Sequence, residues 1–393
     1  MDDLQNIIMN LTPESVEYKS LREIANIKRG GSFQKKDMFD SGMPCIHYGQ
    51  IYTQYDLYAK NSISFVSDET YQKQKKASPG DIIMAVTSEN MEDVCKCVVW
   101  MGNTDIAVSG HTAIISHQQN AKYLAYCFQT TDFQAQKRKI AHGTKVIEVT
   151  PDSLYDISIP VPSLEIQQKV VEVLDALRDA SSELKDLLSK EINYRRQHFS
   201  YFRDELLRFD DDVPLKTLPD ISVNHDRKRK PVTKKNRQAG CYPYYGASGI
   251  VDYVAEYLFD GDYLLVSEDG ANLLARSTPI AFSIGGKNWV NNHAHVLKFE
   301  TYEMRKYVEI YLNSIDLNKY ISGGAQPKLN QDNLNKIQIP VPEFSIVKRV
   351  VDTLVELERL NTEICGELYR EVEQRQKQFE YYRDRLLTFK DAV

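Results

Sequence analysis

Apolar residues recur at alternating spacings of three and four along two segments of the chain. In the first segment they occupy positions 166, 170, 174, 177, 184, 188, 199, 202, 206 and 209. In the second they occupy positions 346, 350, 354, 357, 364, 368, 379, 382, 386 and 389. This spacing is a heptad seam, the pattern of helices that pack along their length. No Pro or Gly interrupts 163–209, so the pattern predicts one long helix. About 45 helical residues would span about 67 Å.

Two positions of the seam are polar in both segments, namely Ser181 with Asn361 and Arg195 with Arg375. Polar residues in a seam cost stability but fix the register and orientation of the partner helices. Matched seams therefore predict that the two helices pack on each other. The alternative is two unrelated amphipathic helices, each packed on its own domain.

The two helical segments belong to an internal repeat with an offset of 180 residues. Ile159-Pro160-Val161-Pro162 returns as Ile339-Pro340-Val341-Pro342, and the offset holds without a gap from 157–211 to 337–391. Identical residues occupy 22 of these 55 positions. Chance does not produce such a match, so the chain consists of two tandem copies, roughly 21–211 and 215–391.

A weaker match relates the variable blocks that precede the two helices. It pairs His47-Tyr48-Gly49 with Tyr244-Tyr245-Gly246, Gly80-Asp81 with Gly261-Asp262, residues 108–111 with 290–293, and Gly143 with Gly323. The blocks look mixed α/β, with turn-then-strand units at 80–86 and 261–266 and short helices at 122–130 and 305–314.

The start of the chain resembles the link between the copies. Residues 16–21 read Val-Glu-Tyr-Lys-Ser-Leu, and residues 213–218 read Val-Pro-Leu-Lys-Thr-Leu. We therefore expect the N-terminus to enter the first domain as the end of the first helix enters the second. The second helix would then end beside the start of the chain, which closes a circular arrangement.

Composition narrows the class of protein. The 393 residues are 42% apolar and 26% charged, which is ordinary globular usage and suggests two or three domains. No apolar run approaches the length of a membrane span, and residues 1–5 carry no basic start of a secretory signal, so we expect a cytoplasmic protein. The six cysteines are too few for a disulfide scaffold, so we expect reduced, mostly structural thiols. The net charge is −6, yet residues 225–238 carry seven basic residues against one acidic residue.

Familiar catalytic motifs are missing from the sequence. It has no Walker loop, no Gly-x-Gly-x-x-Gly after a strand and no Asn/Asp-Pro-Pro-Tyr/Phe loop of an amino-methyltransferase. No carboxylate lies at useful sequence spacing from His293 and His295, so we expect structural or DNA-contacting roles for them rather than a metal site. Glu89 and Glu268 both follow a Ser; a catalytic pair is conceivable, but loop capping is the simpler interpretation.

These features together resemble the specificity subunit of bacterial type I restriction–modification enzymes. The resemblance rests on two variable blocks, two matched helices, the Ile-Pro-Val-Pro entries and the Tyr-Tyr-Arg-Asp-Arg-Leu-Leu-Thr-Phe exit at 381–389, and it covers 16–391. It implies an α+β fold, in which two tandem α/β target-recognition domains are joined by two long antiparallel helices that form a coiled coil with pseudo-two-fold symmetry. The expected parts are recognition domain 1 at 1–156, long helix 1 at 157–211, recognition domain 2 at 212–336 and long helix 2 at 337–393.

The resemblance also implies a function. The chain would be a non-catalytic DNA-reading subunit without cofactor or metal, and a bacterial, cytoplasmic, nucleoid-associated protein. Its partners would be double-stranded DNA, two modification subunits that carry S-adenosylmethionine and methylate adenine, and motor–nuclease restriction subunits. Because the two variable blocks differ, we expect an asymmetric bipartite target with about six or seven unread base pairs between the half-sites. The alternatives are a coiled-coil scaffold and a stand-alone DNA-binding regulator, although no helix-turn-helix signature is present.

Candidate DNA contacts follow from residue chemistry, because Lys and Arg bind phosphates and bidentate side chains read bases. In the first block the candidates are Lys35, Lys36, Tyr48, Gln50, Thr53, Asn90, His111, Lys139, His142 and Lys145. In the second block the candidates for backbone contacts are Arg227, Lys228, Arg229, Lys234, Lys235 and Arg237. The candidates near bases there are Tyr244, Tyr245, Ser248, Lys287, Asn291, Asn292, Gln326 and Lys328. For the basic run the alternative is a solvated loop, and for any single Tyr it is packing in a core.

Overall fold

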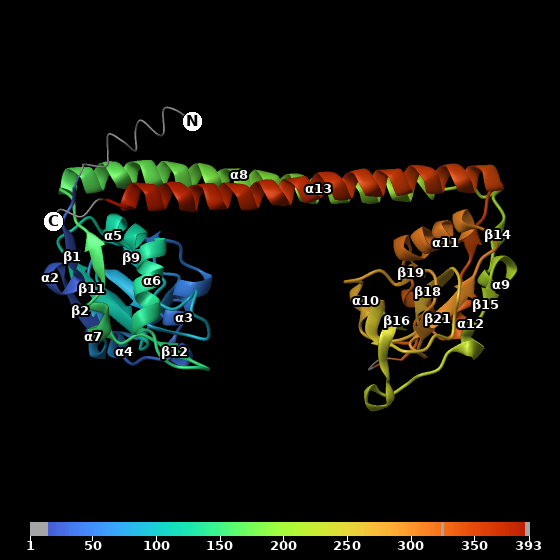
Figure 1. Cartoon of the computed structure of the whole chain (residues 1–393), viewed down its shortest axis with the longest axis horizontal. Helices are drawn as coiled ribbons and strands as arrows, with labels where there is room; N and C mark the ends of the chain where they lie inside the picture. Colours follow the sequence, from blue (N-terminus) through green and yellow to red (C-terminus); the bar gives the residue numbers. More distant parts are fainter. Residues whose placement is uncertain (1–14, 324–325, 390–393) are drawn as a thin grey trace. The chain divides into compact units, whose positions relative to one another are not determined.

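The computed structural model describes residues 15–323 and 326–389 (Figure 1). The described residues do not include the first part of the predicted domain 1–156 or the last part of 337–393. They also exclude residues 1–5, on which the prediction of no secretory signal rests. The chain divides into two compact units. Unit 1 comprises Met1–Leu188 and Arg370–Val393, and unit 2 comprises Ser189–Tyr369. Among the described residues, no helix combines the length and the apolar character needed to cross a membrane.

Two long helices confirm the prediction from the heptad seam. They are α8 (Leu164–Leu206, 43 residues) and α13 (Phe344–Leu387, 44 residues). In unit 1 the first part of α8 packs on the last part of α13, where Leu174 shares a core with Leu386. In unit 2 the chain just after α8 packs on the first part of α13, where Leu207 shares a core with Val351. The two helices are therefore antiparallel within each unit, as the matched seams predict.

One position of the predicted seam is wrong. Phe202 of α8 is 40% exposed, whereas its repeat partner Tyr382 of α13 is 9% exposed and lies in the core of unit 1. Periodicity determines which face of a helix a residue occupies, but it does not determine which segment covers that face. The covering segment differs between the two units.

Unit 1 stacks two β-sheets under the helices. The first sheet has the order β2-β11-β7-β9-β4, and the second has the order β5-β3-β10-β6. The strands of the first sheet are β2 (Ala25–Arg29), β4 (Tyr58–Ala59), β7 (Ile82–Ala85), β9 (Cys97–Trp100) and β11 (Thr112–His117). Those of the second are β3 (Met43–Ile46), β5 (Ser64–Val66), β6 (Lys76–Ala77) and β10 (Ile106–Val108).

Short helices complete unit 1, together with two pairs of short strands. The helices are α2 (Leu21–Ile24), η1 (Lys35–Asp37), α3 (Tyr48–Thr53), α4 (Asp68–Lys73), α5 (Ala121–Cys127), α6 (Thr131–Ile140) and α7 (Pro151–Leu154). The pairs are β1 (Tyr18–Ser20) with β13 (Ser158–Pro160) and β8 (Thr87–Ser88) with β12 (Ile147–Glu148). Side-chain oxygens of Asn120 and Thr130 accept backbone N–H bonds at the starts of α5 and α6, which fixes where these helices begin.

The alternation of β7 explains how the layers of unit 1 stack. Ile82 and Met84 pack toward the core that includes α5, α8 and α13, whereas Ile83 and Ala85 pack into the core between the two sheets. Successive side chains of a strand point to opposite faces, so a strand with both faces buried reads as a continuous apolar run.

Unit 2 repeats this plan. Its sheets have the orders β15-β21-β18-β19 and β17-β16-β20. The strands are β15 (Val223–Asn224), β16 (Ala239–Gly246), β17 (Gly249–Val254), β18 (Tyr263–Ser267), β19 (Ala281–Ile284), β20 (Trp289–Val290) and β21 (Ala294–Lys298), with β14 (Leu215–Lys216) paired to β22 (Ile339–Pro340). The helices are α9 (Leu218–Ile221), η2 (Asp226–Lys228), η3 (Lys234–Asn236), α10 (Asn272–Ala275), α11 (Tyr302–Ser314), η4 (Asn318–Tyr320) and α12 (Gln331–Leu334). Leu264 and Val266 face the helices, and Leu265 faces the second sheet.

The expected junction of the chain start with the second helix is confirmed in unit 1. Strand β1 pairs with β13, as β14 pairs with β22 in unit 2. The hydroxyl of Tyr18 donates to the carbonyl of Phe389 at 3.2 Å and accepts from the Phe389 N–H at 3.3 Å. The end of α13 therefore lies beside the start of the described chain.

Candidate nucleic-acid interface

Two loops of each unit meet at the carboxyl ends of a parallel strand pair. In unit 1, β3 and β10 are parallel and are followed by Tyr48 and His111. In unit 2, β16 and β20 are parallel, and the N–H of Asn291 donates to the carbonyl of Tyr245 at 3.1 Å. We call residues 109–112 and 291–294 the histidine loops. Their equivalent positions confirm the weak match of 108–111 with 290–293.

A third loop lies beside the histidine loop in both units. The backbone of His142 is bridged to Glu148, and that of Ser322 to Lys328, so we call 142–148, and the described residues of 322–328, the glycine hairpins. Gly143 has φ +107° and Gly323 has φ +86°. A Cβ on Gly143 would lie 2.0 Å from the carbonyl oxygen of residue 146, and one on Gly323 would lie 2.4 Å from that of residue 326. Both turns therefore require glycine, for backbone conformation and for space.

Strand register joins the histidine loops to the glycine hairpins. The N–H of Val86 donates to the carbonyl of His111, and the N–H of Glu268 donates to that of His293, both at 2.9 Å. Val86 and Glu268 in turn accept from the residues just after the hairpins, Val149 and Leu329. Glu268 is thus the counterpart of Val86, so the sequence pairing of Glu268 with Glu89 is wrong.

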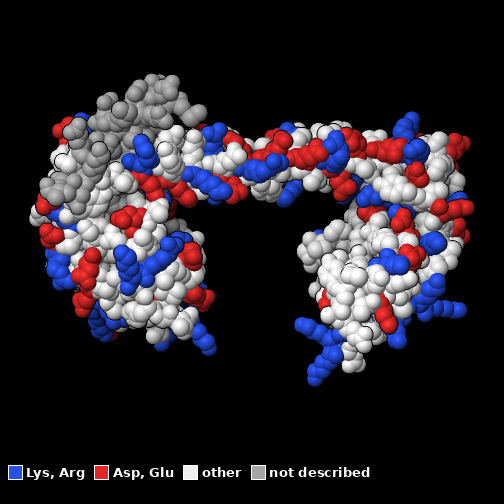
Figure 2. Space-filling model, in the orientation of Figure 1, with Lys and Arg blue, Asp and Glu red and all other residues white. Residues whose placement is uncertain are grey.

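A pair of lysines on a 3₁₀ turn recurs in both units. Lys35 and Lys36 lie on η1 after β2, and Lys234 and Lys235 lie on η3 after β15; all four are exposed. Each turn precedes the strand, β3 or β16, that pairs in parallel with β10 or β20. Sequence comparison missed this correspondence because the connections between the matched residues differ in length. In the register of these strand pairs Tyr245 aligns with Ile46, so the sequence pairing of Tyr245 with Tyr48 is wrong. Figure 2 shows Lys and Arg side chains projecting from the end of unit 2 that lies away from α13.

The segment around η1, the start of α3 and the histidine loop line an open cavity of about 630 Å³ in unit 1. The four predicted residues Lys35, Lys36, Tyr48 and His111 line it, together with Arg29, Gly31, Ser32, Phe33, Gln34, His47 and Gly110. The Tyr48 ring lies 4.5 Å from the His47 ring and 5.2 Å from the His111 ring, measured between centroids. The cavity thus combines cations that suit phosphates with flat rings that suit bases.

His47 is a feature of this cavity that sequence reasoning missed. Its Nδ1 accepts from the N–H of Gly49 at 3.2 Å, so in the neutral ring Nε2 carries the hydrogen. Burial, with the nearby charges of Lys35 and His111, lowers the pKa of His47, which favours this neutral donor. The available signal was its place directly before Tyr48.

The other candidates of the first block separate by their partners. The Gln50 side-chain oxygen accepts from the His47 N–H, the Thr53 hydroxyl donates to the Gly49 carbonyl, and the Asn90 side chain bonds to Asp93. These bonds hold local turns, and contact of these three side chains with DNA stays a prediction. Exposed candidates remain at Lys139, at the end of α6, and at His142 and Lys145, on the glycine hairpin.

The six candidates of the basic run in the second block fall into two groups, one exposed and one bonded within unit 2. Arg227, Lys228, Lys234 and Lys235 are exposed. Arg229 is 14% exposed and bonds to Glu268 at 2.6 Å and to Asp226 at 3.2 Å. Arg237 is 18% exposed, bonds to Asp252 at 3.0 Å and lies over the ring of Tyr244. Because these guanidinium groups already hold parts of unit 2 together, we expect neither arginine to contact phosphates.

Burial also separates the candidates near bases in the second block. Tyr244 and Asn291 are buried at 1% and 7% exposure, which corrects the prediction that they contact DNA. Tyr245 is partly buried, and its ring lies 6.2 Å from that of Phe282. Five candidates are exposed, namely Ser248, Lys287, Asn292, Gln326 and Lys328. Their contact with DNA stays a prediction.

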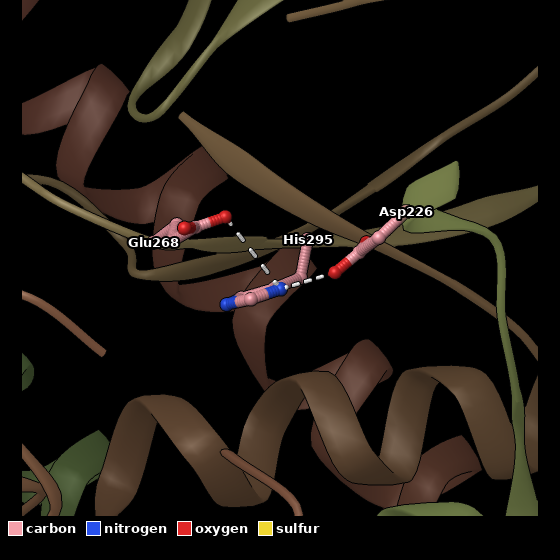
Figure 3. A group of neighbouring side chains, drawn as sticks. All are labelled: Asp226, Glu268 and His295. Carbon is pink, nitrogen blue, oxygen red and sulfur yellow. Dashed lines mark hydrogen bonds and ion pairs between the residues drawn. The ribbon is translucent and has the colours of Figure 1, made fainter. Parts of the chain in front are cut away.

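A buried ionic cluster lies beneath the histidine loop of unit 2 (Figure 3). Nδ1 of His295 lies 2.6 Å from Asp226 and 3.9 Å from Glu268, and its Nε2 lies 2.8 Å from the carbonyl oxygen of Leu329. The prediction that no carboxylate lies at useful spacing from this histidine is therefore wrong, because two carboxylates lie within 4 Å of it in the folded chain. Both acids are distant in sequence, and η2 and the end of β18 bring them together.

The hydrogen bonds of this cluster argue against a metal ion. Both nitrogens of His295 face oxygen acceptors, so both bonds form only when both nitrogens carry hydrogen, and no lone pair remains for a metal. Arg229 bonds both carboxylates, and Lys328 lies 3.4 Å from Glu268. These cationic side chains thus balance the negative charges of Asp226 and Glu268, which a metal ion would balance in a metal site. The cluster ties η2, β21 and the end of the glycine hairpin into one rigid base.

The family model described as the type I restriction modification DNA specificity domain matches residues 13–194 and 211–374. These two matches cover most of the chain, which therefore belongs to this family. A putative type I restriction enzyme specificity subunit of Haemophilus influenzae is 34% identical over 180 residues, which is 45% of this chain and 46% of that protein. The match thus spans about half the length of that relative. The EcoR124I/EcoR124II specificity subunit of Escherichia coli is 28% identical over 262 residues, 59% of this chain and 63% of that protein.

Solved structures support the fold. A chain from a structure of complex assembly and conformational transition of the type I R-M system has a TM-score of 0.77 at 13% identity, and the match covers 96% of this chain and 98% of that one. The HsdS subunit from Thermoanaerobacter tengcongensis has a TM-score of 0.58 at 13% identity, over 96% and 97% of the two chains. The predicted class, two α/β recognition domains joined by long helices, is confirmed.

Proposed function

We propose that this chain is the DNA-reading subunit of a type I restriction–modification complex, and that each unit reads one half of an asymmetric bipartite target. The observation that carries the proposal is the repeated framework. Both units place a Lys-Lys turn, a histidine loop and a glycine hairpin in corresponding positions around a parallel strand pair. A shared framework with different side chains suits two different half-sites on one duplex.

The chemistry of the loops separates phosphate contacts from base contacts. The exposed lysines of η1 and η3 suit phosphates, which position the duplex without carrying sequence information. The rings around the cavity of unit 1 suit bases. A coiled-coil scaffold would need the long helices but would not need two matched sets of such loops, so the structure favours the DNA-reading alternative.

The partners follow from the same proposal. Two modification subunits would dock on the chain and carry S-adenosylmethionine, restriction subunits would join them, and the chain itself would hold no cofactor. Half-sites about 10 base pairs apart, centre to centre, leave about six or seven unread base pairs. Binding to chromosomal DNA would associate the complex with the nucleoid.

Exchange of the variable blocks tests the proposal. A chain that carries block 215–336 in both copies, with both long helices intact, should direct methylation to a symmetric target built from the second half-site twice. The measurement is a map of methylated adenines in cells that carry the modification genes. The control chain contains its own first block recloned through the same junctions, and it should keep the asymmetric target. A symmetric-block chain that still methylates the original asymmetric target would refute the proposal.

A further inference from the structure

His293 of the second histidine loop is held through its backbone N–H, its carbonyl and its Nδ1. Its N–H donates to the side-chain oxygen of Asn291 at 2.8 Å, and its carbonyl accepts from the N–H of Glu268 at 2.9 Å. Its Nδ1 lies 2.9 and 2.8 Å from the two carboxylate oxygens of Asp269. The side chain is nevertheless 49% exposed, so a fixed ring faces solvent.

The contact with Asp269 decides what the ring offers to a ligand. A carboxylate only accepts hydrogen bonds, so Nδ1 must carry the hydrogen. In the neutral ring Nε2 is then an acceptor. Within residues 15–323 and 326–389, Nε2 of His293 has no hydrogen-bond partner.

An outward acceptor cannot bind a phosphate oxygen, which is itself an acceptor. In the major groove only the amino groups of adenine (N6) and cytosine (N4) donate hydrogen bonds. We propose that His293 reads the exocyclic amino group of an adenine or cytosine in the second half-site, and that Asp269 is the positioning residue that fixes its tautomer. This inference rests on the proposed function and names the chemistry that one of its residues recognises.

The corresponding position of unit 1 supports a role specific to the second half-site. Thr87 is bridged to Glu148 as Asp269 is bridged to Lys328, so Thr87 takes the place of Asp269. His111 therefore has no carboxylate at this position. Unit 1 instead contains His47, whose Nε2 carries the hydrogen and donates. In their neutral forms the two imidazoles thus have opposite hydrogen-bond polarity, which fits an asymmetric target.

The test replaces the acceptor by a donor and maps methylation by the complete complex in cells. His293→Lys should exchange the amino-bearing base at one position of the second half-site for guanine or thymine, which carry acceptors there. His293→Gln is the matched control, because its amide oxygen still accepts, and it should keep the original base. Asp269→Leu removes the carboxylate that keeps the hydrogen on Nδ1 of His293, so either ring nitrogen can carry it. This variant should reduce the preference at that position by about five- to ten-fold. The first half-site should stay unchanged in all three.

Other outcomes would overturn the inference. An unchanged second half-site in His293→Lys would show that the ring reads no base, and a changed salt dependence without changed sequence choice would assign it to a phosphate. If the lysine variant fails to assemble, His293→Gln is compared with His293→Leu, and equal preferences in these two would refute the acceptor role. If block exchange moves the half-sites while every His293 variant keeps its preference, this inference fails and the proposed function stands.

Discussion

The basic run of unit 2 provides the sharpest test of how the chain binds DNA. Four of its six predicted phosphate contacts are exposed, and none of these four forms an ion pair within the described residues, namely Arg227, Lys228, Lys234 and Lys235. If all four lie on phosphates, changing them to Gln should lower the slope of log K against log salt by about 0.9 each, or about 3.6 in total. Between 50 and 200 mM salt, the affinity of the variant should therefore fall about 150-fold less than that of the unchanged chain.

The two remaining arginines of the run serve as the matched control. Arg229→Gln removes the guanidinium group that the carboxylates of Asp226 and Glu268 share, in a site where Arg229 is 14% exposed. Loss of one partner from a buried ion pair costs about 3 kcal/mol or more. For a unit of this size, that should lower Tm by roughly 6–12 °C. Arg237→Gln should destabilise less, because its partner Asp252 is 36% exposed.

The assay titrates the assembled complex onto a duplex that contains its target, at several salt concentrations, and follows thermal unfolding of the same samples. The fourfold variant should show a reduced slope, an unchanged Tm and unchanged sequence choice. Each arginine variant should show a lowered Tm and an unchanged slope. A fourfold variant with the original slope would refute the assignment of this run to phosphates, and a reduced slope for Arg229→Gln would refute its structural role.

Further predictions concern the helices, the chemistry and the turns. Each unit contains one end of both long helices. Four residues inserted after Leu184, with four at the matching place in α13, add about 6 Å, and one base pair rises about 3.4 Å, so the unread gap should lengthen by about one or two base pairs. A methylation map with the original gap would show that the length of the helices does not set the gap. The purified chain alone should not transfer methyl groups from S-adenosylmethionine, and transfer without partner subunits would contradict this expectation. Gly143→Ala and Gly323→Ala should each cost about 1–3 kcal/mol in the free energy of unfolding, because both turns combine positive φ with a carbonyl oxygen closer than 3 Å to the added Cβ. Gly366→Ala within α13, where an added Cβ meets nothing within 4 Å, should instead stabilise by about 0.5–1 kcal/mol, and chemical denaturation compares the three.

The sequence by itself determined the long helices, the repeat and the closure of the chain start on the second helix. Helical periodicity is local, since residues three and four apart share a face whatever the rest of the chain does. A match at one constant offset needs no knowledge of contacts either. The same holds for the glycine turns, because Gly143 and Gly323 stand at equivalent places and their backbone conformation follows from local sterics.

Only the tertiary structure decided which side chains are free to meet DNA. Arg227 and Arg229 are two residues apart and chemically alike, yet one is exposed and the other is bonded to Glu268, 39 residues away. Tyr48 lines a cavity, whereas Tyr244 lies buried under Trp289 in a core. Burial and ion pairing depend on which distant segment covers a position, and neither composition nor spacing carries that information.

The same limit explains the errors on Glu268 and His295. The neighbours of these residues come from η2, from β18 and from the glycine hairpin, and strand register sets their distances to a few tenths of an ångström. A hydrogen bond forms or fails over that range, and with it the tautomer that a histidine offers to a base. Residue types can therefore indicate a reading surface, but the direction of each hydrogen bond on it follows only from the packed structure.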